Sequence, residues 1–221
     1  MTRSEIITKF REENPEITDR VLTDSVLNSW CIIGNQEICA RTRLIVTTTA
    51  EVINSVTGQE KYDLTTISKF FDIDEYPGGG IRRVATSGTK KRLIKKSISE
   101  LDDMSSSWRT ASSGTPRYYY RRGQYFGVYP KPDSTNDYFE VDAVLIADDF
   151  DDDAKTPYNQ LLHLKPFHYG IVKYLAWRAK AKVGKPQDAA TAMAEYLDYL
   201  KWITKEIGGG KYNVIYLRPN R

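Results

Sequence analysis

The sequence predicts an α+β protein in which N- and C-terminal helices form a bundle around an inserted antiparallel β region, with a C-terminal extension. Apolar residues recur at helical spacing near both ends of the chain, whereas the middle shows short runs typical of strands. Helices that pack together on either side of an insertion would anchor both of its ends at one place. We therefore expect a helical core of residues 1–43 and 156–207, an inserted β-rich region of residues 44–155, and a C-terminal arm of residues 208–221.

The clearest helical pattern lies between residues 158 and 207. Residues at intervals of three and four form one apolar stripe: Met193, Leu197, Leu200, Ile203 and Ile207. An earlier stripe comprises Phe167, Ile171, Tyr174, Leu175 and Ala179. Between them, a glycine and a proline within residues 183–186 favour the end of one helix, so the two helices should run antiparallel. Aromatic residues beside the stripes are expected to be core or subunit contacts: Trp177, Tyr196, Tyr199 and Trp202.

Two further helices are predicted before the β region. Residues 2–11 form a short amphipathic helix that ends before an Asn-Pro pair. A second helix, capped by Thr18, reaches about Thr42, and its wide apolar arc suggests burial on more than one side. Cys31 and Cys39 lie ~12 Å apart on this helix, which is too far for a disulfide bond, so both should be reduced core thiols.

The β region should contain several short strands and one helical turn at residues 97–104. Its strand-like runs are residues 45–53, 58–64, 81–86, 92–95, 117–121, 124–129 and 138–147. The Arg-Gly pair at residues 122–123 predicts a hairpin between two of these runs. This is the strongest hairpin signal in the chain.

Length and composition limit the classes of protein to which the chain can belong. With 221 residues and 40% apolar composition, it is long enough for one large domain or a domain with a sizeable insertion. It lacks an apolar run of the ~20 residues that cross a bilayer and a basic-then-apolar leader, so we expect a cytosolic product. A net charge of +3 is too small to indicate nucleic-acid binding unless the charges cluster.

Basic residues do cluster between residues 81 and 99, a stretch that contains no acidic residue. The members are Arg82, Arg83, Lys90, Lys91, Arg92, Lys95 and Lys96. Basic strands with nearby aromatic residues can hold a phosphate backbone. A solvated basic edge that prevents sheets from pairing with one another is an equally good interpretation.

An aspartate-rich loop precedes the C-terminal helices. Its members are Asp148, Asp149, Asp151, Asp152 and Asp153. The alternate spacing resembles part of a calcium loop, but Ala154 and Gln160 stand where a glycine and a bidentate carboxylate are required. We therefore expect a solvated loop whose charges precede a helix starting near Pro157.

Candidate catalytic or cofactor-binding residues are lacking. His163 and His168 are the only histidines, and neither has a cysteine or carboxylate at ligand spacing. No nucleophile–base set or glycine-rich phosphate loop is evident. The sequence thus predicts no catalytic, cofactor-binding or metal-binding residues, and no enzyme.

The C-terminal arm follows three glycines at residues 208–210. It contains apolar, aromatic and basic residues without an acid, among them Tyr212, Val214, Ile215, Tyr216, Leu217 and Arg218. Such a composition is atypical of a solvated terminus. We expect the arm to dock either on the chain's own β region or on a neighbouring protein.

The order of these parts resembles the bacteriophage head-to-tail adaptor (connector) family, the tail tubular protein A type of short-tailed phages. The resemblance is carried by the helix at residues 24–43, by Gly114-Thr-Pro-Arg-Tyr118 leading to Gly127-Val-Tyr-Pro-Lys-Pro132, and by the strand at residues 139–146. The acidic loop and closing helices with Tyr169, Tyr174 and Tyr196 complete it. Residues 72–99 have no counterpart in the family pattern.

The resemblance implies a structural virion protein without cofactors. Usually twelve copies would form a ring that docks on the portal protein, with tail proteins (nozzle or tail tube) below and genomic DNA passing through without sequence specificity. The arm resembles the extension with which family members grip the portal. The protein would be located at the portal vertex of the virion and would assemble in the host cytoplasm. The alternative is a monomeric nucleic-acid-binding protein that uses the basic strands at residues 81–99; a hydrolase using the aspartate loop is a third hypothesis.

Overall fold

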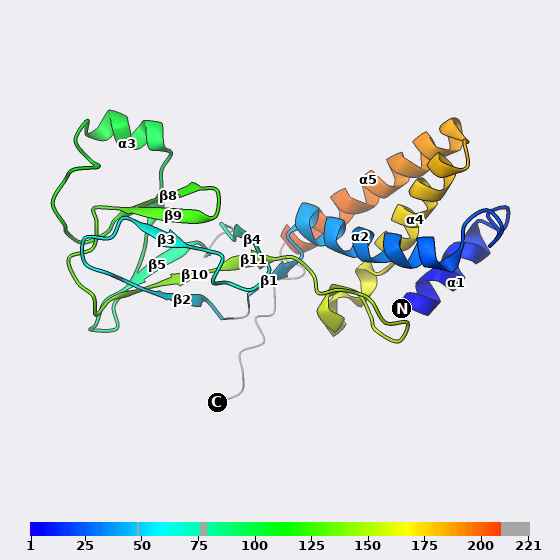
Figure 1. Cartoon of the computed structure of the whole chain (residues 1–221), viewed down its shortest axis with the longest axis horizontal. Helices are drawn as coiled ribbons and strands as arrows, with labels where there is room; N and C mark the ends of the chain where they lie inside the picture. The colour runs from blue at the N-terminus through cyan, green and yellow to red at the C-terminus, as the bar shows by residue number, and fades with distance from the viewer. Residues whose placement is uncertain (48, 76–78, 209–221) are drawn as a thin grey trace. The chain divides into compact units, whose positions relative to one another are not determined.

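The computed structural model describes residues 1–47, 49–75 and 79–208, and the chain forms two compact units. Residues 1–45 and 146–208 form a helical unit, and residues 46–145 form a β-rich unit (Figure 1). The described residues contain five α-helices and three sheets of three or four strands. The predicted α+β class is therefore confirmed. The acidic loop belongs to the helical unit, although the sequence pattern assigned it to the inserted region.

The helical unit is built from α1 (Arg3–Glu13), α2 (Asp24–Thr42), α4 (Tyr169–Lys182) and α5 (Pro186–Gly208). α4 contacts the other three helices, and α2 also contacts α1 and α5. Gly184 lies between α4 and α5 with a φ of 75°, the left-handed conformation that glycine adopts most easily. Pro186 begins α5, where its missing N–H costs no helical hydrogen bond.

Local side-chain chemistry fixes where these helices begin. Thr2 Oγ1 accepts a hydrogen bond from the Glu5 N–H at 3.2 Å, and Glu5 Oε2 accepts one from the Thr2 N–H at 2.8 Å, so α1 starts with a capping box. The predicted helix start at Thr18 is wrong, because α2 begins at Asp24. Arg11 explains the difference. Its guanidinium donates hydrogen bonds to the backbone carbonyls of Ile17 and Leu22, at 2.7 and 2.6 Å, and so holds the segment before α2 in a non-helical turn.

The predicted helix near Pro157 is also wrong. Two 3₁₀ segments, η1 (Tyr158–Gln160) and η2 (Leu162–Phe167), precede α4 instead. All three residues of η1 have φ between 55° and 59°, which is outside the right-handed helical region. Pro166 within η2 further prevents a continuous α-helix.

The core-facing side of α5 differs slightly from the predicted stripe. Met193 is 40% exposed, whereas Ala192 and Tyr196 are buried together with Ile203. The buried stripe therefore includes an aromatic residue that the sequence placed beside it. Cys31 and Cys39 on α2 are buried, free thiols, as expected, and burial raises the pKa of Cys31 to about 12.

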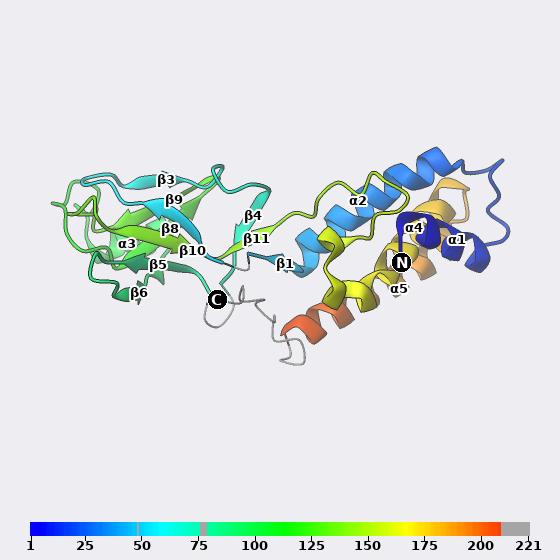
Figure 2. The same ribbon diagram turned by 90° about the horizontal axis from the view of Figure 1, so that it is seen from below.

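Three sheets contain the strands. β1 (Ile45–Val46), β11 (Ala143–Leu145) and β4 (Phe70–Ile73) form the first, in that order. The second has the order β2 (Glu51–Asn54), β10 (Tyr138–Val141), β5 (Ile81–Val84) and β6 (Lys90–Arg92). The third has the order β3 (Lys61–Asp63), β9 (Tyr125–Tyr129), β8 (Tyr118–Arg122) and β7 (Ile94–Lys95), of which β3, β9 and β8 are labelled in Figure 2. Among the registers described, only the β7–β8 pairing is parallel.

Two predictions about strands have clear outcomes. The hairpin around Gly123 is confirmed, since β8 and β9 pair antiparallel and Gly123 has a φ of 60°. The predicted strand at residues 138–147 instead divides at Asp142 into β10 and β11, which lie in different sheets. The Asp142 backbone donates to the Gly80 carbonyl at 3.0 Å and accepts from the Asp74 N–H at 2.8 Å, so it serves as the point of division.

The β-rich unit has an aromatic core. Tyr62, Phe126 and Phe139 contact one another, with ring centroids 5.0–5.6 Å apart. In a smaller cluster, Leu101 of α3 (Ile98–Met104) packs with Trp108 and Tyr120. These two clusters bury the faces that the short strands could not cover alone.

Candidate functional site

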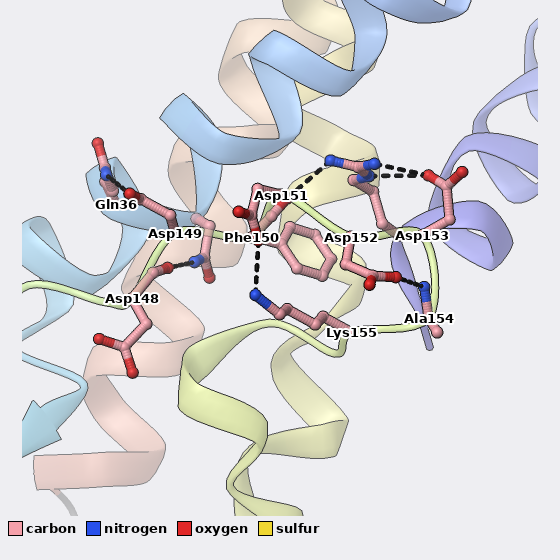
Figure 3. A network of polar contacts seen from close by, with 11 residues as sticks. Gln36, Asp148, Asp149, Phe150, Asp151, Asp152, Asp153, Ala154 and Lys155 are labelled. Atoms are coloured by element: carbon pink, nitrogen blue, oxygen red, sulfur yellow. Dashed lines mark hydrogen bonds and ion pairs between the residues drawn. The ribbon is translucent and has the colours of Figure 1, made fainter.

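The acidic loop is bound to the helical unit rather than open for a ligand (Figure 3). Arg3 of α1 donates to Asp153 Oδ1 from Nε at 3.0 Å and from Nη2 at 2.8 Å, and its Nη1 donates to the Phe150 carbonyl at 3.1 Å. The Arg3 side chain is only 9% exposed, whereas that of Asp153 is 70% exposed. One buried guanidinium therefore fixes two points of the loop.

A second anchor comes from α2. Asn35 donates from Nδ2 to the Asp148 carbonyl at 3.2 Å, and its Oδ1 accepts the Tyr158 N–H at 3.0 Å. Next to it, Gln36 donates to Asp149 Oδ1 at 3.2 Å. Asn35 is buried, so these hydrogen bonds satisfy a polar side chain inside the helical unit. Asn35 was not identified from the sequence because a single polar residue in an apolar helical arc carries no specific signal.

The remaining loop carboxylates also bind protein groups. Asp151 pairs with Lys155 at 2.6 Å, and Asp152 Oδ1 accepts the Ala154 N–H at 2.8 Å. The hydrogen bond from Lys155 lowers the pKa of Asp151. In the part of the chain that the structure describes, no three His, Cys, Asp or Glu side chains come together as metal ligands would. The arrangement supports the interpretation of a structural loop.

The two histidines do not form a site together. His168 is buried, and its Nδ1 lies 2.7 Å from the Met1 ammonium nitrogen. Burial, followed by the charge of that ammonium, lowers the pKa of His168 to about 4, so the ring is neutral at pH 7. His163 lies within η2 and is half-buried. The His168 ring also packs against the Tyr158 ring, with centroids 5.6 Å apart.

The basic strands are largely neutralised by carboxylates from a distant part of the sequence. β10 lies beside β5, which brings acids to the basic run. Arg82 pairs with Asp142 at 2.8 Å and Glu140 at 3.4 Å, Arg83 Nε donates to Asp137 at 2.7 Å, and Lys90 pairs with Glu140 at 2.6 Å. The apparent excess of positive charge in the sequence is therefore much smaller in the fold.

The other members of this run differ from one another. Lys95 pairs with Glu75 at 2.6 Å and Lys96 pairs with Glu100 at 3.0 Å. Lys91 and Arg92 are exposed on β6, and neither forms an ion pair with a described residue. A groove of ≈ 570 Å³ is lined by Lys95, Lys96, Ser97, Glu100, Arg121 and Gly123. Because its lysines have acidic partners, this groove is not a concentrated phosphate-binding site.

The C-terminal arm, including Tyr212, Val214, Ile215, Tyr216, Leu217 and Arg218, lies outside the described residues. Within residues 1–47, 49–75 and 79–208, no helix has the length and apolar character needed to cross a membrane.

The chain thus has a helical unit, a β-rich unit and an acidic loop whose carboxylates largely bind protein groups. The family described as the SU10 adaptor protein matches residues 1–210, and the chain belongs to that family. This assigns it a structural role as a phage adaptor in the virion, a class that is not enzymatic, and implies association with portal and tail proteins. The predicted resemblance to head-to-tail adaptors is thereby confirmed. No curated protein sequence matches the chain.

Proposed function

We propose that copies of this chain form a ring that docks on the portal at the capsid vertex and joins the capsid to the tail. The membership of residues 1–210 in the SU10 adaptor protein family carries this proposal. The resemblance to head-to-tail adaptors implies twelve copies and a central channel for genomic DNA. We expect a monomer in dilute solution and a ring on the portal.

Exposed apolar residues on the helical unit support contacts between subunits. Leu162 is 73% exposed, Ile33 is 47% exposed and Trp202 is 39% exposed, although Trp202 packs one ring edge against Phe167. Large apolar groups left in water favour association when a neighbour can cover them. A ring requires such surfaces on two sides of each subunit, because its interfaces are heterologous.

For the basic strands, we propose a role between subunits. Lys91 and Arg92 lie on β6, at the edge of the second sheet, and are the members of the run without a described acidic partner. Positive charge on an edge strand prevents the sheet from pairing with other sheets without selectivity. The same charge can still bind an acidic surface of a neighbouring subunit. Lys91→Ala/Arg92→Ala should therefore weaken ring formation on the portal without changing the stability of the free chain.

We propose that the C-terminal arm binds the portal. The six residues Tyr212, Val214, Ile215, Tyr216, Leu217 and Arg218 combine apolar surface with one basic group. Extended apolar segments bind preformed grooves through alternate side chains and backbone hydrogen bonds. The arm would then hold the adaptor to the capsid vertex.

Purified portal, mixed with full-length chain or with a chain lacking residues 211–221, tests these proposals by electron microscopy. The full-length chain should add a ring beneath the portal, and the shortened chain should remain free. The thermal stability of the shortened chain should nearly equal that of the full-length chain. Normal docking by the shortened chain would refute the role of the arm, and failure of the full-length chain to decorate portals would refute the adaptor proposal.

A further inference from the structure

A second basic run lies towards the C-terminal end of α4 and in the turn that follows it. Residues 173–187 contain five basic residues and no acid. Four of them gather towards the α4–α5 turn: Arg178, Lys180, Lys182 and Lys185. None of these four forms an ion pair with a residue that the structure describes. In this respect they differ from Arg82, Arg83 and Lys90, which face carboxylates.

Two indole rings hold part of this run in place. The Arg178 Cζ lies 5.6 Å from the ring centroid of Trp30 on α2 and 5.6 Å from that of Trp177 on α4. Lys182 Nζ lies 5.5 Å from the Trp30 centroid. Trp177 in turn stacks on Tyr196 of α5, at 5.7 Å and an interplanar angle of 14°. Cation–π attraction thus orders the two charges without neutralising them.

The helix dipole explains only part of this arrangement. Lys180 and Lys182 lie in the last turn of α4, where positive charge is favoured. Arg178 lies further back, where the dipole acts weakly, and Lys185 follows the helix. The Arg178 guanidinium is exposed, and no hydrogen bond from it to a described residue is present. Its N–H donors are therefore held at the surface and are available to an oxyanion.

We propose that Trp30, Arg178, Lys180, Lys182 and Lys185 form a binding surface for the phosphate backbone of duplex DNA. Cations lie over the indole faces of Trp30 and Trp177, which favours contact with phosphates over base stacking on those faces. Arg178 and Lys182 are one helical turn apart, about 6 Å along the helix axis, close to the ~6.8 Å rise over two phosphate steps of one DNA strand. All four charged residues are cations without an acceptor, so they favour backbone contact over base recognition.

This surface is additional to the adaptor role and does not depend on ring formation. It also differs from the nucleic-acid hypothesis for residues 81–99, because it uses the helical unit. The two locations can be separated by matched variants that each remove two exposed positive charges. Arg178→Ala/Lys182→Ala removes two members of the proposed surface, and Lys91→Ala/Arg92→Ala is the control on β6.

Fluorescence anisotropy of a labelled mixed-sequence DNA duplex, titrated with full-length chain at several salt concentrations, measures the binding. If four phosphates are contacted, the affinity should fall about 150-fold between about 50 and about 200 mM salt, and only about 12-fold for Arg178→Ala/Lys182→Ala. The control variant should retain the salt dependence of the unchanged chain. Circular dichroism verifies that each variant is folded, and Arg178→Gln/Lys182→Gln replaces the alanine pair if its helices are lost.

Three outcomes would overturn the proposal. The unchanged chain could fail to bind the duplex at low salt, or the β6 control could lose as much salt dependence as the α4 variant. In the third outcome, the α4 variant binds the duplex with the same affinity and salt dependence as the unchanged chain, so DNA is bound elsewhere. The portal-decoration experiment tests the adaptor role separately, so failure of one proposal does not imply failure of the other.

Discussion

Arg3→Ala should lower the free energy of unfolding of the helical unit. The side chain is 9% exposed and makes three hydrogen bonds to the acidic loop. Its removal leaves the Phe150 carbonyl without that donor, which costs about 1–3 kcal/mol. The lost pairing with the exposed Asp153 adds only about 0.2–1 kcal/mol because water screens it. The expected total is about 1–4 kcal/mol.

Urea denaturation followed by tryptophan fluorescence is suited to this measurement, because Trp30, Trp177 and Trp202 all belong to the helical unit. The midpoint should fall for Arg3→Ala with little change in the slope of the transition. Lys155→Ala, which removes the partner of an exposed carboxylate in the same loop, serves as the control and should leave the midpoint nearly unchanged. Equal midpoints for the two variants would refute the reasoning.

Asp153→Ala tests how the contribution is divided. Arg3 keeps its bond to the Phe150 carbonyl in this variant, so the loss should be smaller than for Arg3→Ala. The double variant should lose less stability than the sum of the two single losses, since the side chains share an interaction. If the losses of stability of the two single variants add up to that of the double variant, the Arg3–Asp153 interaction makes no contribution to stability.

Gly127→Ala should cost about 1–3 kcal/mol by overpacking, because a Cβ at Gly127 would overlap the buried Tyr120 ring; Gly114→Ala, which meets only ordinary contacts, is the control, and equal melting temperatures would contradict the expectation. Burial lowers the pKa of His168 to about 4 from 6.5, so the unfolded chain binds the proton more readily and stability should fall as the pH drops from about 6.5 to about 4. Denaturation at several pH values should show that His168→Phe flattens this slope, and an unchanged slope would exclude His168 as its source. Hydrogen bonds from the Ser97 backbone and from the Lys96 side chain lower the pKa of Glu100 to about 2 from 4.5, so the capping of α3 should be complete above pH 4.5 and be lost towards pH 2; an NMR titration of Glu100 with a midpoint near 4.5 would argue against it.

The sequence predicted the helices well because their periodicity is local. The stripes of α4 and α5 and the glycine–proline turn between them lie within a few residues of one another, and so does the hairpin at Gly123. The errors arise from side-chain contacts that a periodic pattern does not encode. Arg11 of α1 binds carbonyls in the turn before α2, and Tyr196, whose ring lies 5.5 Å from that of Tyr174, is buried whereas Met193 is exposed.

Charge clusters were harder to interpret than helices. The run at residues 81–96 contains no acid, but Glu140 of β10 and the flanking Asp137 and Asp142 lie across the sheet from it. The neighbours and register of a strand cannot be deduced from its own sequence. The neutralisation of its charges by acids on another strand could therefore not be predicted. The run at residues 173–187 is the reverse case: Lys173 pairs with Glu195, but the four later cations at residues 178–185 have no ion-pair partner among the described residues.

The division of the helical unit between two distant stretches of chain has a consequence for synthesis on the ribosome. Residues 1–45 lack their packing partners α4 and α5 until the last part of the chain has been made. Residues 46–145 are continuous, and all their strands, β1 included, have been made before α4 and α5. Because domains generally fold as their contacts become available, the β-rich unit should acquire protease resistance first. Meanwhile α1 and α2 would expose apolar surface, making this interval the period of greatest vulnerability to aggregation.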